Sequence, residues 1–189
     1  MELFGRSLLF WTVVLTAALM AVGGGFWWYK QSTACTIVSY DRARDFDRLV
    51  AIFTADAYWL DERPADGALN TFVHELDLIE KPDAQPTHEG PMQWLVCRIG
   101  ARTAGFISYY MTQADTGRVL YLGVDREYRH YGAGRALMHA AMRELEQQGA
   151  KTIYLATRVN NLRAQSLYKQ LGFVQTSSTG SFIFMERYA

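Results

Sequence analysis

The segment VDREYRHYGAGRALM, at 124–138, combines residue types that suit the binding of a diphosphate. A β-prone stretch runs into a glycine-containing loop and then into an amphipathic helical pattern. The start of a helix presents free amide N–H groups and a positive dipole end, and Gly132 and Gly134 let an anion approach the backbone closely. Arg129 and Arg135 add positive charge. We interpret this loop as a candidate anion site, with an ordinary tight turn before a helix as the alternative.

Two familiar nucleotide-binding patterns do not fit this loop. The dinucleotide fingerprint needs a third glycine, where this chain has Leu137, and an acidic residue about twenty positions later. The Walker pattern needs a Gly-Lys-Ser or Gly-Lys-Thr triplet, which does not occur in the sequence.

A second segment, NLRAQSLYKQLGFV at 161–174, reads as a capped helix. Asn161 is a good N-cap and Gly172 a good stop. Within it, Tyr168 carries a phenol with an ordinary pKa near 10, which can lend a proton to a departing anion. The alternative is that Tyr168 only continues an apolar stripe formed with Ala164, Leu167 and Leu171.

The remaining elements alternate, with turn residues between them, and this pattern predicts a mixed α/β domain over residues 31–189. Strands are expected at 36–40, 94–99, 104–111, 119–124, 151–156 and from 173 onward. Helices are expected at 44–59, around 69–78, from the glycine loop to Gly149, and at 161–171.

Together, the segments at 124–138 and 161–174 resemble the GNAT superfamily of acetyl-CoA-dependent N-acyltransferases. The first is similar to the family's Arg/Gln-x-x-Gly-x-Gly/Ala pyrophosphate loop, and the second to its Asn-x-x-Ala-x-x-Leu-Tyr-x-x-x-Gly-Phe closing segment. The resemblance implies an α/β fold with a splayed mixed sheet flanked by helices. The pantetheine arm would lie in the gap between the strands ending near Val124 and Ala156.

The resemblance also implies roles for individual residues. The backbone of Leu122 and Val124 would contact the pantetheine and the thioester carbonyl, Asn161 would hydrogen-bond the arm, and Tyr168 would protonate the departing thiolate. The pyrophosphate would be surrounded by the loop residues Arg129, Tyr131, Gly132, Ala133, Gly134 and Arg135. Acetyl-CoA is the implied cosubstrate, and no metal is expected.

The general base has no obvious candidate. Many relatives place a glutamate on the central strand, but residues 118–124 contain no carboxylate. Tyr121 on that strand, or His74, Glu75 or Asp77 from the preceding helical stretch, could accept the amine proton directly or through water. Each of these residues could equally be structural or solvated.

Composition limits the other function classes. The chain has 189 residues, is 50% hydrophobic and 20% charged, and carries 19 basic and 19 acidic residues, so it predicts one globular domain without the basic field of a nucleic-acid partner. Acidic residues dominate 45–115 and basic ones 116–170. The acidic half could attract a small-molecule or peptide amine, or could be simply solvated. Five aromatic residues could wall the acceptor groove or pack in the core: Tyr58, Trp59, Trp94, Tyr109 and Tyr110.

The N-terminal segment predicts a membrane anchor over residues 1–30. The stretch between Arg6 and Lys30 carries no charge and is long enough, as a helix, to cross a bilayer. The alternative is a cleaved signal peptide. Basic residues are more frequent after the stretch than before it, which predicts a single-pass protein with its main domain on the cytoplasmic side. A small-residue stripe of Ala17, Ala21 and Gly25 arises by chance or favours a homodimer.

The two cysteines, Cys35 and Cys97, lack metal-ligand spacing, and we expect them to be reduced thiols. Two functions remain open. The first is a membrane-anchored N-acetyltransferase in which an amine attacks acetyl-CoA directly in a ternary complex. The second is a catalytically inactive relative that keeps the fold as a CoA-binding or interaction module at the membrane.

Overall fold

The computed structural model describes residues 35–61, 63–79, 90–112 and 115–189. One compact unit begins at Cys35 and runs to the last residue. The predicted anchor at 1–30 lies outside the described residues. Within those residues, the structure contains no helix of the length and apolarity that crossing a bilayer requires.

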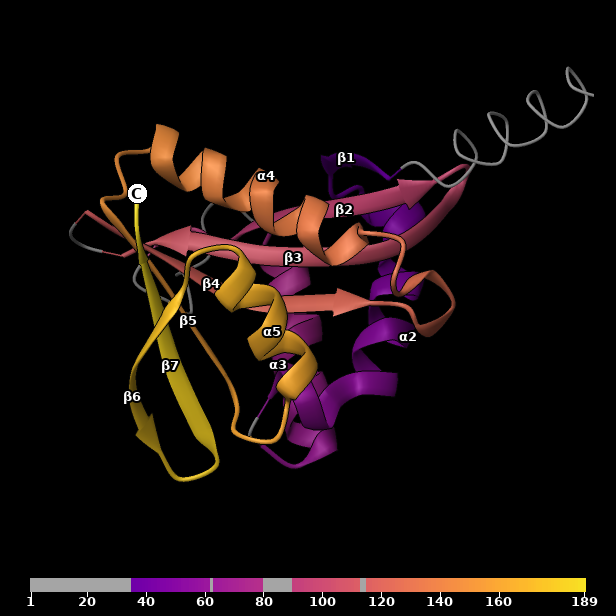
Figure 1. The fold of residues 1–189 in the computed structure, drawn as a ribbon. Coiled ribbons are helices and arrows are strands. Elements are labelled where there is room, and N and C mark those ends of the chain that lie inside the picture. Colours follow the sequence, from indigo (N-terminus) through magenta and orange to yellow (C-terminus); the bar gives the residue numbers. More distant parts are fainter. Residues whose placement is uncertain (1–34, 62, 80–89, 113–114) are drawn as a thin grey trace, which may run out of the picture. The chain divides into compact units, whose positions relative to one another are not determined.

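Seven strands form one mixed sheet in the order β1-β2-β3-β4-β5-β7-β6 (Figure 1). Neighbouring strands are antiparallel except β4 and β5, which are parallel. The strands are β1 (Thr36–Ser39), β2 (Gln93–Ile99), β3 (Arg102–Met111), β4 (Thr116–Val124), β5 (Thr152–Arg158), β6 (Val174–Thr179) and β7 (Phe182–Tyr188).

Helices cover both faces of the sheet (Figure 1). They are α2 (Arg42–Leu60), α3 (Ala65–Leu78), the 3-10 turn η1 (Arg126–Tyr128), α4 (Ala133–Gln147) and α5 (Leu162–Gln170). Alternation along β2 shows how the two cores arise: Leu95 and Cys97 pack with α4, whereas Trp94 and Val96 pack with α2 and α3.

The predicted α/β class and most elements are confirmed, with shifted ends. Helix α2 begins two residues earlier than expected because the carboxylate of Asp41 accepts the amide N–H of Ala43 and forms an N-cap. Helix α3 begins at Ala65, four residues earlier than expected, directly after Pro64. Strand β4 begins at Thr116 instead of Val119. The expected strand after Phe173 is β6, and it pairs with β7, a strand that we did not predict.

The parallel pair β4 and β5 separates along its length. Only three register pairs join the two strands, at Thr116–Arg118 of β4 and Thr152–Tyr154 of β5. Beyond these pairs, the strands continue to Val124 and Arg158 without pairing to each other. We call the paired part the closed end of the fork and the unpaired part its open end. The predicted splayed sheet is therefore confirmed.

An extra residue in β4 reverses its side-chain pattern at the start of the open end. The register with β3 passes from Val119 to Tyr121 while β3 advances by one residue, so Leu120 forms a β-bulge. Val119 packs with α4, whereas Tyr121 packs with α2 and α3, although strict alternation would put both on one face. The buried hydroxyl of Ser108 accepts the amide N–H of Tyr121 at 3.2 Å and so holds the bulge.

The expectation of reduced cysteines is wrong in this structure, because Cys35 and Cys97 form a disulfide. They are 62 residues apart in sequence, but Cys35 directly precedes β1, which pairs with β2 at Ile37 and Cys97. This pairing brings the two Cα atoms to 5.5 Å. Spacing along the chain carries no information about such a contact across strands.

Candidate functional site

The open end of the fork contains a cavity of about 390 Å³. Its walls come from β4, β5, the loop before α4, and helices α2 and α5, with Phe182 of β7 at one edge. The cavity therefore runs from the start of α4, between the two separated strands, to the end of α2. Of the predicted site residues, those that line it are Leu122, Val124, Arg129, Gly132, Ala133, Gly134, Arg135, Asn161 and Tyr168.

The start of α4 has free backbone donors at this cavity. The first amide of the helix with an internal acceptor is that of Ala136, which donates to the carbonyl of Gly132 at 2.9 Å. The N–H groups of Ala133, Gly134 and Arg135 have no acceptor within the described part of the chain, and no side chain caps the helix. Three amides and the positive helix end thus remain available for an anion.

The two loop glycines have different roles. Gly132 has φ of 84°, a left-handed conformation that a side chain disfavours. Gly134 lies within the first turn of α4, and a Cβ there would meet Leu167 at 3.5 Å and Val124 at 3.7 Å, which are ordinary contact distances. The backbone conformation at position 132 therefore favours glycine, whereas at Gly134 the protein itself leaves room for a methyl group.

The basic residues of the loop are tied to the protein. Arg129 donates from Nε to the Val124 carbonyl at 2.9 Å, and its guanidinium pairs with the carboxylate of Asp56. Burial lowers the pKa of Arg129. Arg135 donates to the side-chain amide of Gln170. Tyr131 is 52% exposed and is not part of the cavity wall.

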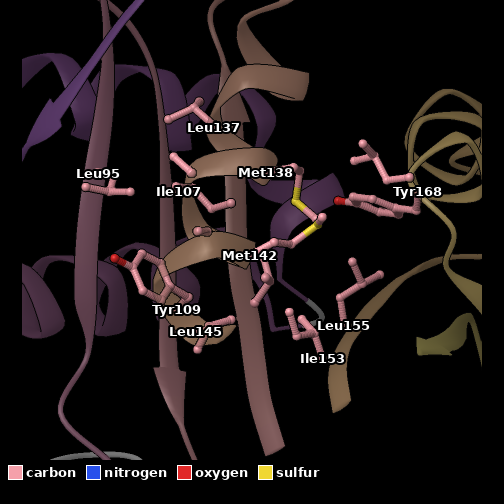
Figure 2. Packing of buried hydrophobic residues seen from close by; sticks show 14 of the residues in the cluster. Leu95, Ile107, Tyr109, Leu137, Met138, Met142, Leu145, Ile153, Leu155 and Tyr168 are labelled. Atoms are coloured by element: carbon pink, nitrogen blue, oxygen red, sulfur yellow. The ribbon is translucent and has the colours of Figure 1, made fainter. Parts of the chain in front are cut away.

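Helix α5 brings Asn161 and Tyr168 to the same cavity. Asn161 is the N-cap, as predicted, and its side-chain oxygen accepts the Ala164 amide at 3.3 Å. Tyr168 is 7% exposed and packs beside Phe173. Its hydroxyl points from α5 toward Met138 of α4 (Figure 2) and has no hydrogen-bond partner among the residues that the structure describes. Burial raises the pKa of Tyr168 to about 12, so the phenol is protonated at neutral pH.

None of the four residues considered for the general base lies on the cavity wall. The Tyr121 hydroxyl donates to Asp61 at 3.4 Å, and burial, with the nearby carboxylates of Glu75 and Asp61, raises the pKa of this tyrosine. Glu75 is a buried residue of α3, and its charge contributes to the raised pKa of Tyr121. Asp77 pairs with Arg42, and His74 is exposed.

Several cavity residues were missed from the sequence. Asp56 is the only carboxylate on the wall among the described residues, and it lies on α2, where we had expected a plain amphipathic helix. His130 stands in the loop with a positive φ of 69°, which is rare for a side chain other than glycine. The apolar part of the wall at the end of α2 comes from Trp59, Leu60 and Phe182.

The five aromatic residues were expected either to line the acceptor groove or to pack in the core, and the structure shows which do each. Trp59 lines the cavity, whereas Trp94, Tyr109 and Tyr110 are buried in the sheet and its cores, and Tyr58 is exposed. Of the acidic side chains at 45–115, only Asp56 lines the wall, within the described ranges. No group of three or more histidine, cysteine, aspartate or glutamate side chains that could hold a metal occurs in those ranges either.

A second cavity, of about 680 Å³, lies on the other side of the ion pair between Asp56 and Arg129. Both residues line both cavities, so this pair forms part of the wall between them. The second cavity lies between α2, the turn from β2 to β3, and η1, and five arginines line it. Three of these pair with carboxylates of the same wall: Arg48 with Asp125, and both Arg129 and Arg126 with Asp56, the last at 3.7 Å.

Comparison with known proteins agrees with this geometry. Residues 54–173 match the model of the Acetyltransferase (GNAT) family. The chain is 30% identical over 110 residues to the [ribosomal protein bS18]-alanine N-acetyltransferase of Escherichia coli, covering 58% of this chain and 73% of that protein. It is 40% identical over 63 residues to an N-alpha-acetyltransferase of Sulfurisphaera tokodaii, covering 33% of this chain and 38% of that protein.

Solved structures share the fold. The PaiA N-acetyltransferase of Thermoplasma acidophilum, solved in complex with coenzyme A, superposes with a TM-score of 0.66 at 18% identity, over 82% of this chain and 99% of that one. The Escherichia coli ribosomal-protein-S18-alanine N-acetyltransferase gives a TM-score of 0.59 at 22% identity, over 81% and 92%. The match to the family model covers more than half of the chain, and the chain therefore belongs to the GNAT family of acetyl-CoA-dependent N-acetyltransferases.

Proposed function

We propose that this protein transfers the acetyl group of acetyl-CoA to the N-terminal amine of a protein or peptide. One observation carries the proposal: the three free amides at the start of α4 open into the same cavity that passes through the fork to the Tyr168 phenol. An acyl donor with a diphosphate at one end and a thioester at the other matches this arrangement. The acceptor class is proposed from the relatives that acetylate an alanine amine.

The amides of Ala133, Gly134 and Arg135 would hold the pyrophosphate of acetyl-CoA. Arg129 would act indirectly, because its guanidinium already fixes the loop to Val124 and Asp56. The pantetheine arm would then follow the open edge of β4 at Leu122 and Val124, with Asn161 on the opposite wall. These roles place the thioester near the bulge, between the separated strands.

The chemistry needs no covalent enzyme intermediate. The amine nitrogen attacks the thioester carbonyl, negative charge develops on its oxygen, and backbone N–H groups of β4 stabilise that charge. The carbon–sulfur bond then breaks, and Tyr168 gives its proton to the departing thiolate. A phenol held neutral by burial suits this role, since it carries the proton throughout the neutral range. The amine proton leaves to solvent.

Thiol release from acetyl-CoA, measured across a panel of acceptors, tests the proposal. Peptides beginning with alanine, serine or methionine should be acetylated at their first nitrogen, as read by mass spectrometry. The same peptides with a blocked N-terminus are the matched control and should give no turnover. Tight CoA binding without turnover on any peptide, polyamine or lysine would instead favour the inactive binding module.

We further propose that residues 1–30 anchor the enzyme in a membrane, as a single-pass segment with the domain at 31–189 on the cytoplasmic side. The uncharged stretch between Arg6 and Lys30 and the excess of basic residues after it support this placement. The disulfide between Cys35 and Cys97 favours the opposite side, because disulfides persist mainly in oxidising compartments.

Fractionation and thiol labelling decide this placement. The full chain should remain in the membrane fraction after an alkaline wash, and a chain starting at residue 31 should leave it. On the cytoplasmic side, a membrane-impermeant protease should degrade the domain only after cell lysis. Alkylation of Cys35 and Cys97 in intact cells reports whether the disulfide forms there. A domain cleaved from outside unbroken cells would contradict the proposed orientation.

A further inference from the structure

The mouth of the cavity between α2 and β7 is held by one buried arginine that does not itself line the cavity. Arg158 is the last residue of β5 and is 8% exposed. Its guanidinium donates to the carbonyl oxygens of Tyr58 and Asp61, the latter at 2.8 Å, and to the Ser181 hydroxyl at 3.3 Å. One side chain therefore joins β5, the end of α2 and the turn from β6 to β7.

The contacts of Arg158 satisfy groups that α2 leaves open. The last carbonyls of a helix have no internal partner, and a cation near them also interacts favourably with the helix dipole. Helix α2 has no basic residue in its own last turn. Arg158, about a hundred positions away in sequence, donates to Tyr58 within that turn and to the C-cap residue Asp61.

Aromatic rings, and no carboxylates, cover the Arg158 guanidinium in the described part of the chain. Its central carbon lies 4.1 Å from the ring centroid of Tyr58 and 4.8 Å from that of Phe182. No carboxylate pairs with this guanidinium among the described residues, and the Asp61 carboxylate binds Arg63 instead. The charge of Arg158 is thus committed to helix α2 and to the two rings.

The partners of Arg158 stand directly beside the cavity wall. Trp59 and Leu60, between its two carbonyl acceptors, line the cavity, as do Thr157, which precedes it, and Phe182, which follows Ser181. The carbonyl of Arg158 also accepts the Gln165 side-chain amide of α5 at 3.1 Å. Displacing the guanidinium would therefore remove hydrogen bonds from the end of α2 and from the turn before β7 together.

We propose that Arg158 is a positioning residue that sets the width of the cavity mouth between Trp59 and Phe182, and thereby the binding of the acceptor amine. The inference rests on the proposed function, because the acceptor must enter opposite the pyrophosphate end of the cavity. Acetyl-CoA is held mainly at the start of α4, so its affinity is expected to be independent of Arg158.

Substitution of Arg158 by Lys and by Gln tests the proposal, with Arg98→Lys and Arg98→Gln as matched controls. Arg98 is also largely buried and also holds α2, through Asp45 near the opposite end of that helix, at 2.8 Å. Arg158→Gln should raise the acceptor KM about tenfold, while the Kd for acetyl-CoA stays within about twofold. The acceptor KM of Arg158→Lys should lie between those of the wild type and Arg158→Gln, because an ammonium cannot reproduce the planar set of guanidinium donors. The Arg98 variants should lower the Tm without changing the acceptor KM.

Hydrogen exchange gives a second readout that does not depend on turnover. In the Arg158 variants, the amides of residues 58–61 should exchange faster, and those of the first turn of α2 should not. Ser181→Ala, which removes only one of the three hydrogen bonds, should give a smaller change in the same direction and covers the case in which Arg158→Gln does not fold. Unchanged exchange at 58–61 would overturn the inference even if the wild type proved inactive. An acceptor KM that rises equally in the Arg98 variants would overturn it as well.

Discussion

The closed and open ends of the fork are built by different interactions. At the closed end, backbone pairing joins Thr116–Arg118 to Thr152–Tyr154, and apolar side chains such as Leu145 and Ile153 pack beneath it without exposure. At the open end, the strands do not pair with each other, and a cavity of about 390 Å³ takes the place of the core. Side-chain contacts of Arg129 and Arg158 hold its margins.

This contrast separates stability from activity along a single pair of strands. No residue of the closed end lines the cavity, so changes there should act on the free energy of unfolding. The open end carries little packing between its strands, so changes there should act on binding and turnover. Three substitutions and one pH profile test this division.

The largest effect is expected at the closed end, from Leu145→Ala. Leu145 is fully buried in α4 and stands over Gly117, at which a Cβ would meet it at 2.8 Å. The substitution removes buried methyl groups and leaves a cavity, which costs about 3.5 kcal/mol of stability. Denaturant unfolding measures this loss, and Leu162→Ala, at a position 72% exposed, is the control. A change in acetyl-CoA affinity larger than about twofold would break the division.

At the open end, Gly134→Asp should abolish useful binding of acetyl-CoA. The added carboxylate would stand near the pyrophosphate and the free amides, at a cost of about 3 kcal/mol, or ~200-fold in affinity. Gly134→Ala is the control and should bind nearly normally, since the nearest protein atom to its Cβ would be at 3.5 Å. Calorimetric titration measures the affinity of both variants for acetyl-CoA. Normal affinity in Gly134→Asp would show that the pyrophosphate does not bind at this loop.

Tyr168→Phe should lower kcat about 100-fold, the usual scale for losing a general acid. The hydroxyl makes no hydrogen bond to the described residues, so the fold and the Kd for acetyl-CoA should change little. Steady-state kinetics at saturating acetyl-CoA, compared with Tyr131→Phe on the exposed part of the loop, measures the effect. An unchanged kcat in Tyr168→Phe would show that Tyr168 contributes to packing and not to catalysis.

The smallest effect is expected in the pH dependence of stability, which the Tyr168 phenol at the open end should influence. Burial raises the pKa of Tyr168 to about 12, against an ordinary value of 10. Above pH 10 the unfolded chain loses this proton while the folded chain keeps it, so stability falls as pH rises from 10 to 12. At pH 11 the loss should be about 1.4 kcal/mol relative to pH 9, and Tyr168→Phe should lack this part of it. Identical alkaline profiles for the two proteins would contradict the buried, neutral phenol.

The sequence predicted the strands and helices better than the long-range contacts around the cavity, for a physical reason. Alternation and helical periodicity report burial, so the strands, the helices and the separation of β4 from β5 could be read or inferred from family resemblance. The positions of Gly132 and Asn161 followed from local turn and cap chemistry, and the role of Tyr168 was inferred from the family resemblance. The roles of Asp56 and Arg158 depend on contacts across about 70 to 100 positions, and no local pattern carries them.

The disulfide between Cys35 and Cys97 determines which strand would bear a mechanical force applied to the preceding chain. Without it, tension would enter at the four-residue edge strand β1 and could peel it from the sheet one hydrogen bond at a time. The covalent link delivers that force to β2, which has neighbours on both sides. If residues 1–30 are held in a bilayer, the disulfide would therefore protect β1 from being pulled out of the sheet by force on that segment.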